Sequence, residues 1–204
     1  MSIKTSDRPV LEATLESGEV VLDALRIVDV LADIPFIGTA IKICRANDAI
    51  RQRIYTAKLA KFINDLSSVP QSDIEKIRLT INSSGDEARR VGETVLMILE
   101  QVTDMDKPVV LARLLLCYAE GVISSVELRR LYQAINSAFM DDIKEFLAAP
   151  ALDNRQAAWM ENLVSAGLSK MAVGKTYDSD GEIYFDSSPL GERLRVAHCH
   201  RSLI

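Results

Sequence analysis

The sequence predicts an all-α fold, namely a multi-helix bundle followed by a small C-terminal helix–β-hairpin–helix cap that is winged-helix-like. Hydrophobic residues make up 48% of the 204 residues and charged residues 26%, so the chain can bury a core. Aromatic residues make up only 5%, which leaves the core to aliphatic side chains and favours packed helices over a β-sandwich. Apolar residues recur at helical spacing along most of the chain before Pro150.

Composition changes after Pro150, where Gly, Ser and Asp become frequent. We therefore expect residues 1–150 to form the helical bundle and residues 151–204 to form the small winged-helix-like cap. The last residues, HCHRSLI, are expected to be a disordered tail.

The first predicted helix lies within residues 16–33. Its charged residues fall on one narrow stripe and leave a broad apolar face. Pro35 is expected to end it, because the residue before a proline is driven out of helical conformation. A second helix is predicted from about residue 37 to residue 66. The stretch of residues 31–43 is interpreted as a buried corner between two core helices. If the wide apolar face of residues 20–43 is instead a contact surface, it is predicted to bind a partner through Leu22, Leu25, Val28, Phe36 and Ile37.

Further helices are predicted before Pro150. Ser72 and Glu75 have capping-box spacing at the start of one helix, and NSSGDEARR (82–90) is either a loop or a weak point within a long helix, since the helical pattern continues to Val102. A strongly apolar helix follows Pro108, and Gly121 is expected to end it. Ser124 and Glu127 repeat the capping-box spacing, and the apolar pattern then predicts one helix to about residue 146.

In the cap, a short helix around Trp159 is expected to stop at Gly167. Two strand-like segments, near 168–177 and 182–186, flank an Asp-Gly turn, which is a strong hairpin signal. Pro189 then predicts the first turn of a terminal helix.

Charge and cysteine content narrow the function classes. The net charge of −5 gives no overall attraction to nucleic acid or anionic lipid. The three cysteines (Cys44, Cys117 and Cys199) are far apart and form no CxxC motif, so neither a disulfide framework nor a zinc site is predicted. Reduced thiols and an N-terminus without a signal pattern predict a cytoplasmic protein.

Motifs for catalysis and metal binding are missing from the sequence. It contains no GxSxG, Walker, GxGxxG or HExxH motif, so we predict no enzyme, no catalytic residue and no cofactor. GVISSVEL imitates the end of a calcium loop, but Leu116 and Tyr118 stand where ligands are needed. His198 and His200 lie in the expected tail, and no metal is predicted there.

Two alternative functions stay open. The charge-free run Ile34–Ile41 is too short to span a membrane, yet two helices joined around it could insert as a hairpin, as in a membrane-disrupting effector. The winged-helix-like cap could instead belong to a DNA-binding regulator. Its possible nucleic-acid contacts are Arg155, Lys170 and Lys175, although neighbouring acidic residues offset them and make nucleic acid an unfavoured partner.

Residues 33–145 resemble a group of small bacterial and phage-associated helical proteins, which share a proline–glycine entry, a K-x-x-x-F-L-like helix and a later K-a-x-l-l helix. Lys58, Phe62, Lys107 and Leu111 occupy those places, and Ile63 replaces the leucine. The resemblance implies a bacterial setting connected with antiviral defence and brings no catalytic residue. The leading hypothesis is a non-enzymatic protein-interaction module that forms homo-oligomers.

Overall fold

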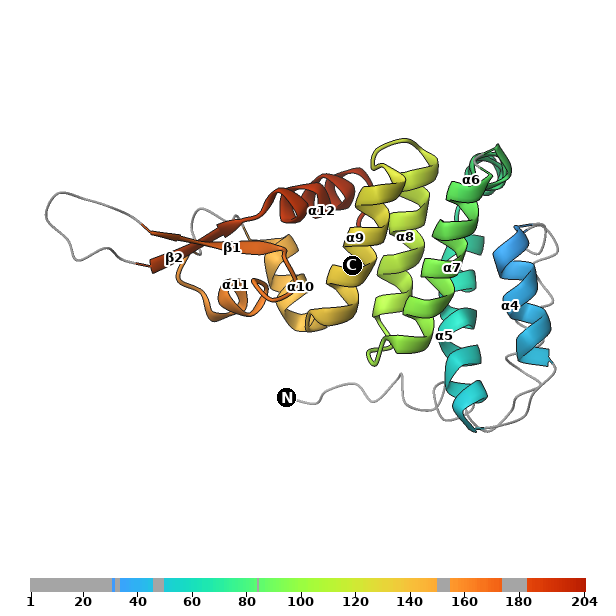
Figure 1. Cartoon of the computed structure of the whole chain (residues 1–204), viewed down its shortest axis with the longest axis horizontal. Helices are drawn as coiled ribbons and strands as arrows, with labels where there is room; N and C mark the ends of the chain where they lie inside the picture. The colour runs from blue at the N-terminus through green and yellow to red at the C-terminus, as the bar shows by residue number, and fades with distance from the viewer. Residues whose placement is uncertain (1–30, 32–33, 46–49, 84, 150–154, 174–182) are drawn as a thin grey trace, which may run out of the picture. The chain divides into compact units, whose positions relative to one another are not determined.

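The computed structural model describes residues 31, 34–45, 50–83, 85–149, 155–173 and 183–204. It confirms the predicted fold class, because the described chain is mostly helical and ends in an antiparallel hairpin followed by a helix (Figure 1). The chain divides into two compact units, residues 1–100 and 101–204. The sequence suggested a boundary near residue 150 instead.

The described part of the first unit consists of packed helices. They are α4 (Pro35–Arg45), α5 (Ile50–Ser67), α6 (Gln71–Ser83) and α7 (Asp86–Gln101), whose last residue already belongs to the second unit. Residues 37–66, predicted as one helix, are thus divided between α4 and α5, which pack against each other. The predicted helix within 16–33 lies outside the described residues, apart from helical Leu31.

Pro35 is the first residue of α4, a position where proline's fixed φ suits a helix and its missing N–H costs nothing. The core of this unit is mostly aliphatic, as the low aromatic content predicts. Its fully buried side chains include Ile37, Leu59, Phe62, Ile63, Leu66, Ile77, Val91, Val95 and Leu99.

The turn between α6 and α7 decides between the two interpretations of residues 82–90 in favour of a loop, and Gly85 takes a φ of +50° there. The predicted capping box at the start of α6 is wrong. Pro70 already accepts the N–H of Asp73 at 2.9 Å, so Ser72 lies inside the first turn. Glu75 pairs with Arg78 at 2.6 Å.

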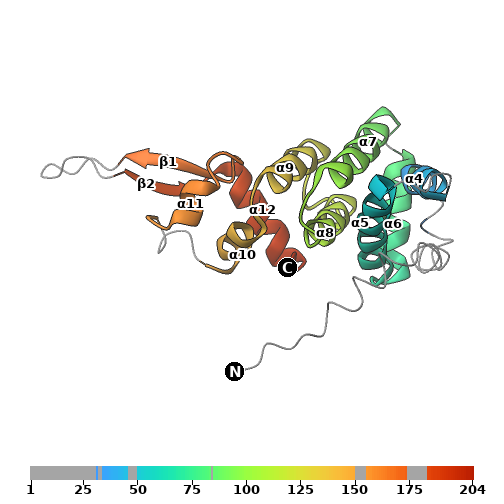
Figure 2. The same ribbon diagram turned by 90° about the horizontal axis from the view of Figure 1, so that it is seen from below.

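The second unit combines helices with the hairpin (Figures 1 and 2). Its elements are α8 (Lys107–Ala119), α9 (Ser125–Ser137), α10 (Met140–Ala148), α11 (Ala158–Asn162), β1 (Ser169–Val173), β2 (Ile183–Ser187) and α12 (Pro189–His200). The strands are antiparallel, with Met171 opposite Phe185, and they lie beside α11. The predicted Asp-Gly turn lies outside the described residues.

The connection between α8 and α9 follows the sequence prediction. Gly121 has a φ of +73°, and Val122 donates its N–H to the Cys117 carbonyl at 2.9 Å, which closes a Schellman-type turn. The capping box of Ser124 and Glu127 is present in full.

The predicted continuous helix to residue 146 is wrong, because α9 ends at Ser137 and α10 begins at Met140. Ala138 has an extended ψ of 153° at the break. The buried Lys107 donates its Nζ to the Asn136 carbonyl at 2.9 Å, which satisfies a carbonyl at the end of α9. A distant side chain therefore supports a break that no local glycine or proline signals.

The expected disordered tail is also wrong. Helix α12 runs to His200, and Leu203 beyond it is fully buried. Arg193 of α12 forms an ion pair with Glu127 of α9 at 2.7 Å, so the two helices are joined by charge as well as by packing. Because α12 also packs on α8, the cap shares its core with residues 101–149.

Candidate interaction groove

The first unit contains a groove of about 410 Å³ beside α7, which we call the α7 groove. Side chains and backbone from α4, the end of α6 and the first three turns of α7 line it. They are Phe36, Thr39, Ile81, Asn82, Gly85, Ala88, Arg89, Glu93 and Leu96. The lining is mainly apolar in the interior and charged at the edge.

The walls of the groove depend on the close approach of α4 to α7. A Cβ atom on Gly92 would lie 2.8 Å from the Cβ of Phe36, so only glycine leaves room for Phe36 here. Ile81 and Ala88 are buried, whereas Phe36 and Leu96 are half-buried and stay partly accessible. The groove therefore offers apolar surface that a further side chain could cover.

The edge of the groove carries both signs of charge one helical turn apart. The side chains of Arg89 and Glu93 are 67% and 60% exposed, and their closest N–O distance is 3.9 Å. Arg89 also lies 3.5 Å from Asp86. Exposed pairs at these distances contribute little to stability, so both side chains can turn to an outside partner at low cost.

The predicted partner-binding residues fall into three groups. Phe36 lines the α7 groove, as an accessible contact residue should. Ile37 is fully buried inside its own unit. Leu22, Leu25 and Val28 lie outside the described residues. The α7 residues that line the groove were not predicted from the sequence. Ala88, Arg89, Glu93 and Leu96 follow the amphipathic spacing of an ordinary surface helix.

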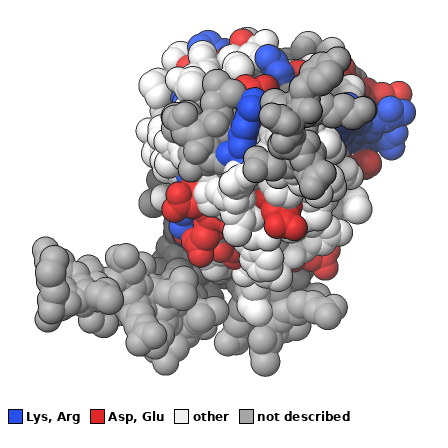
Figure 3. Space-filling model, turned by 90° about the vertical axis from the view of Figure 1, so that its left-hand side faces the viewer, with Lys and Arg blue, Asp and Glu red and all other residues white. Residues whose placement is uncertain are grey.

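The two possible nucleic-acid contacts that the structure describes, Arg155 and Lys170, both lie beside the acidic Asp186. Arg155 pairs with Asp186 at 2.9 Å and lies 4.7 Å from the ring centre of Tyr184. Lys170 is exposed but opposite Asp186 in the hairpin register, and Lys175 lies outside the described residues. On the face of the molecule drawn in Figure 3, acidic and basic side chains both occur among the described residues.

The two lysines of the family resemblance are buried helix caps. Lys58 donates its Nζ to the Glu100 carbonyl at 2.8 Å, as Lys107 does to Asn136. Burial lowers the pKa of each ammonium group, while Glu100 and Asp104, respectively, act against that lowering. Phe62 and Leu111, four residues further on, are fully buried, which makes the shared pattern a packing pattern.

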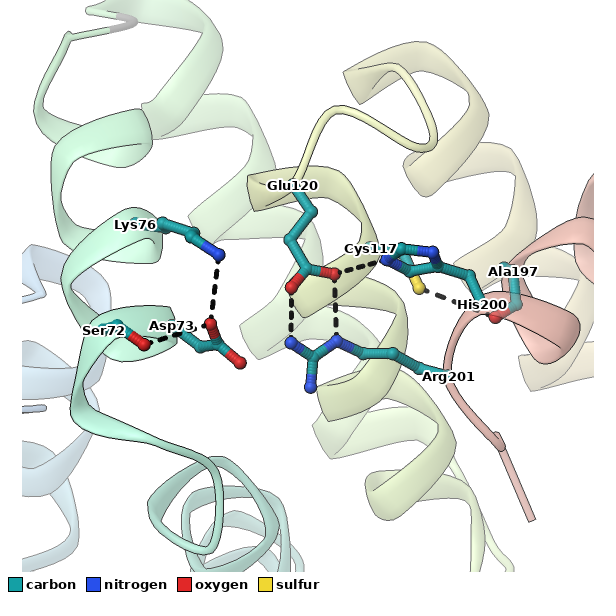
Figure 4. Close-up of polar contacts among 8 residues, drawn as sticks. All are labelled: Ser72, Asp73, Lys76, Cys117, Glu120, Ala197, His200 and Arg201. Carbon is teal, nitrogen blue, oxygen red and sulfur yellow. Dashed lines mark hydrogen bonds and ion pairs between the residues drawn. The ribbon is translucent and has the colours of Figure 1, made fainter.

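A cluster of polar side chains connects the end of α8 to the end of α12 (Figure 4). Glu120 accepts hydrogen bonds from Arg201 and contacts His200 at 2.9 Å. The bonds from Arg201 are the main reason that the pKa of Glu120 is lowered. Cys117 lies 3.7 Å from the Ala197 carbonyl, and burial raises the pKa of its thiol to about 11. This cluster was not predicted from the sequence, because residues 198–204 were expected to form a disordered tail.

The described residues contain neither a candidate metal-binding group nor a candidate membrane-spanning helix. Its histidine, cysteine and acidic side chains form no group of three that could hold a metal ion. Across the same residues, no helix is both long enough and apolar enough to cross a membrane. No protein-family model, curated protein or solved structure matches the chain.

Proposed function

We propose that this protein is a non-enzymatic interaction module that self-associates through the α7 groove. The single observation that carries the proposal is the groove itself, where accessible apolar walls from Phe36 and Leu96 meet an edge of opposite charges. Such a surface is typical of protein interfaces, which combine an apolar centre with a polar rim.

The charges on α7 favour a second copy as the occupant. In an isologous contact, two α7 helices would cross antiparallel about a two-fold axis, so each residue meets a complementary position of the other copy. An axis midway between Arg89 and Glu93 places each arginine opposite the other copy's glutamate. The surface is therefore complementary to itself in charge.

The same register supplies an apolar side chain for the groove. Met97 lies one turn beyond Glu93 and is 59% exposed. With Arg89 opposite Glu93, Met97 of each copy comes opposite Gly85 of the other, at one end of the groove. A flexible methionine suits an irregular apolar surface.

Sedimentation velocity over a range of protein and salt concentrations tests this proposal. Met97→Glu is expected to shift the protein towards monomer, whereas Leu79→Glu is the matched control. Leu79 is 57% exposed on α6 and does not line the groove. A wild-type protein that stays monomeric, or an equal effect of both variants, would contradict the proposal.

Charge-reversal variants test the proposed register of the two α7 helices independently. Arg89→Glu and Glu93→Arg are each expected to weaken association by placing like charges together, and the double variant is expected to restore it. A double variant that associates no better than the single variants would exclude the proposed register.

The biological setting rests on the resemblance of residues 33–145, which supports a bacterial role in antiviral defence. The membrane-effector alternative predicts leakage of liposomes by the purified protein. The DNA-binding alternative predicts salt-dependent retention on DNA. Either behaviour, without self-association, would replace the proposed function.

A further inference from the structure

Residues 201–203, which follow α12, pack back onto the second unit, and we call them the α12 clasp. Arg201 donates its Nε to Glu120 Oε2 at 2.9 Å. Arg113 of α8 donates to the Ser202 carbonyl, and the side chain of Leu203 is fully buried. Three consecutive residues are therefore held by three different contacts.

A fourth contact closes the clasp on its own helix. The Leu203 N–H lies 3.1 Å from Nδ1 of His198. A backbone N–H can only donate, so Nδ1 must carry a lone pair and the ring proton must sit on Nε2. Protonated imidazole has no acceptor, so this contact exists only with neutral His198.

From this geometry we propose that His198 is a proton-operated catch for the α12 clasp. Neutral His198 holds the Leu203 backbone and keeps its side chain in the core. Protonation converts Nδ1 into a donor that faces another donor, which opens the clasp at Leu203 and exposes its side chain while Arg201 stays paired with Glu120. The inference is independent of self-association, because it involves only residues of the second unit.

The charged neighbours of His198 favour its neutral form. Burial lowers its pKa most, and Arg113 from α8 and Arg195 from its own helix lower it further. The end of α12 acts in the opposite direction, since helix C-termini attract cations. The net direction is downward, so a protonated His198 is disfavoured while the clasp is closed.

The direction of the pH effect follows from this lowered pKa. The open clasp returns His198 towards its ordinary pKa of 6.5 and then binds protons more readily than the closed clasp. Closing is therefore fully favoured above that pH and weakens as the pH falls below it. Glu120, whose pKa is lowered from 4.5, stays ionised in the same range and continues to hold Arg201.

Hydrogen exchange of the Leu203 amide in the full chain, measured by NMR, tests the catch. Between about pH 7.5 and about pH 5.5, we expect its protection factor to fall by up to about tenfold. His198→Gln keeps a neutral acceptor that does not titrate and is expected to remove this fall. His200→Gln is the matched control, since His200 contacts Glu120 instead, and is expected to preserve it.

A pH titration of the wild-type protein tests the proposal without any substitution, so it does not depend on whether the variants fold. The ring signals of His198 and the amide signal of Leu203 are expected to change with the same midpoint, below pH 6.5. Different midpoints, or a protection factor that is constant with pH, would overturn the proposal. An unchanged fall in folded His198→Gln, or its loss in His200→Gln, would do the same.

Discussion

At the scale of single residues, several buried polar groups in this protein complete backbone hydrogen bonding. Lys58 and Lys107 bury their stems and place an ammonium group at the end of a helix, where carbonyls lack helical partners. Tyr132 is fully buried and donates its hydroxyl to the Leu111 carbonyl at 2.9 Å. These side chains stabilise the fold, and none of them faces the α7 groove.

Cys117 is expected to resist alkylation in the folded protein. With a pKa of about 11, only about 0.1% of its thiol is ionised at pH 8, and the side chain is buried. Cys199 is exposed and should react with iodoacetamide about 100-fold faster or more. Peptide mass spectrometry measures both rates, and unfolding in urea should abolish the difference. Equal rates in the folded state would contradict the described burial of Cys117.

Gly92→Ala is expected to destabilise the first unit by forcing Phe36 away from α7. Overpacking of this kind costs about 1–3 kcal/mol, against which alanine regains about 1 kcal/mol of helix propensity. Urea unfolding measures the balance. Phe36→Gly in the same chain provides the control, because it removes the Cβ and ring atoms that the new Cβ would meet.

The overpacking cost of Gly92→Ala should therefore disappear in the Phe36→Gly background. An equal cost in both backgrounds would mean that the two residues do not contact each other.

At the scale of elements, local signals and distant contacts fix different helix ends. The Gly121 turn and the Ser124 capping box are local, and both occur where the sequence predicts them. The end of α9 depends on Lys107, 29 residues earlier in the chain. Helix boundaries without a local signal therefore need the packed structure to explain them.

The N-terminal end of α12 is expected to tolerate no side chain at Gly191. A Cβ there would lie 2.0 Å from the Leu168 carbonyl oxygen, a backbone atom that cannot turn aside. Gly191→Ala should lower the free energy of unfolding by about 3 kcal/mol or more. Val196→Ala, on the exposed side of the same helix, should change it by less than about 0.5 kcal/mol. Thermal and urea unfolding compare the two, and equal stabilities would contradict this helix placement.

At the scale of the whole molecule, two units each bury their own mostly aliphatic core. The second unit unites α8–α10 with the cap, because Leu194 and Ala197 of α12 are buried and α12 packs on α8 and α9. The winged-helix-like elements are thus part of a larger unit. The proposed self-association belongs to the first unit and the proposed catch to the second.

A fragment of residues 101–204 is expected to fold without the first unit. Its elements make most of their contacts with one another, and a chain of this length can bury a sufficient core. Circular dichroism should show a helical spectrum and a single cooperative melting transition. A fragment of residues 151–204, which follows the boundary predicted from sequence, should not melt cooperatively because α8 and α9 are missing. The reverse result would support the boundary near residue 150.

The amino-acid sequence by itself determined the all-α class, the hairpin strands, the α8–α9 connection and the start of α12. These features depend on periodicity, glycine and proline geometry and capping spacing, all of which act over a few residues. Of the two predicted contact residues that the structure describes, Phe36 lines the α7 groove and Ile37 is buried.

Only the tertiary structure decided the unit boundary, the break after α9, the ordered tail and the α7 groove. Each depends on residues far apart in the chain, such as Lys107 with Asn136, or Glu120 with Arg201. Hydrophobic periodicity shows which face of a helix is buried, but it does not show which partner covers that face. For this reason the tail appeared loose in the sequence, although Leu203 and Arg201 find their partners on elements already folded.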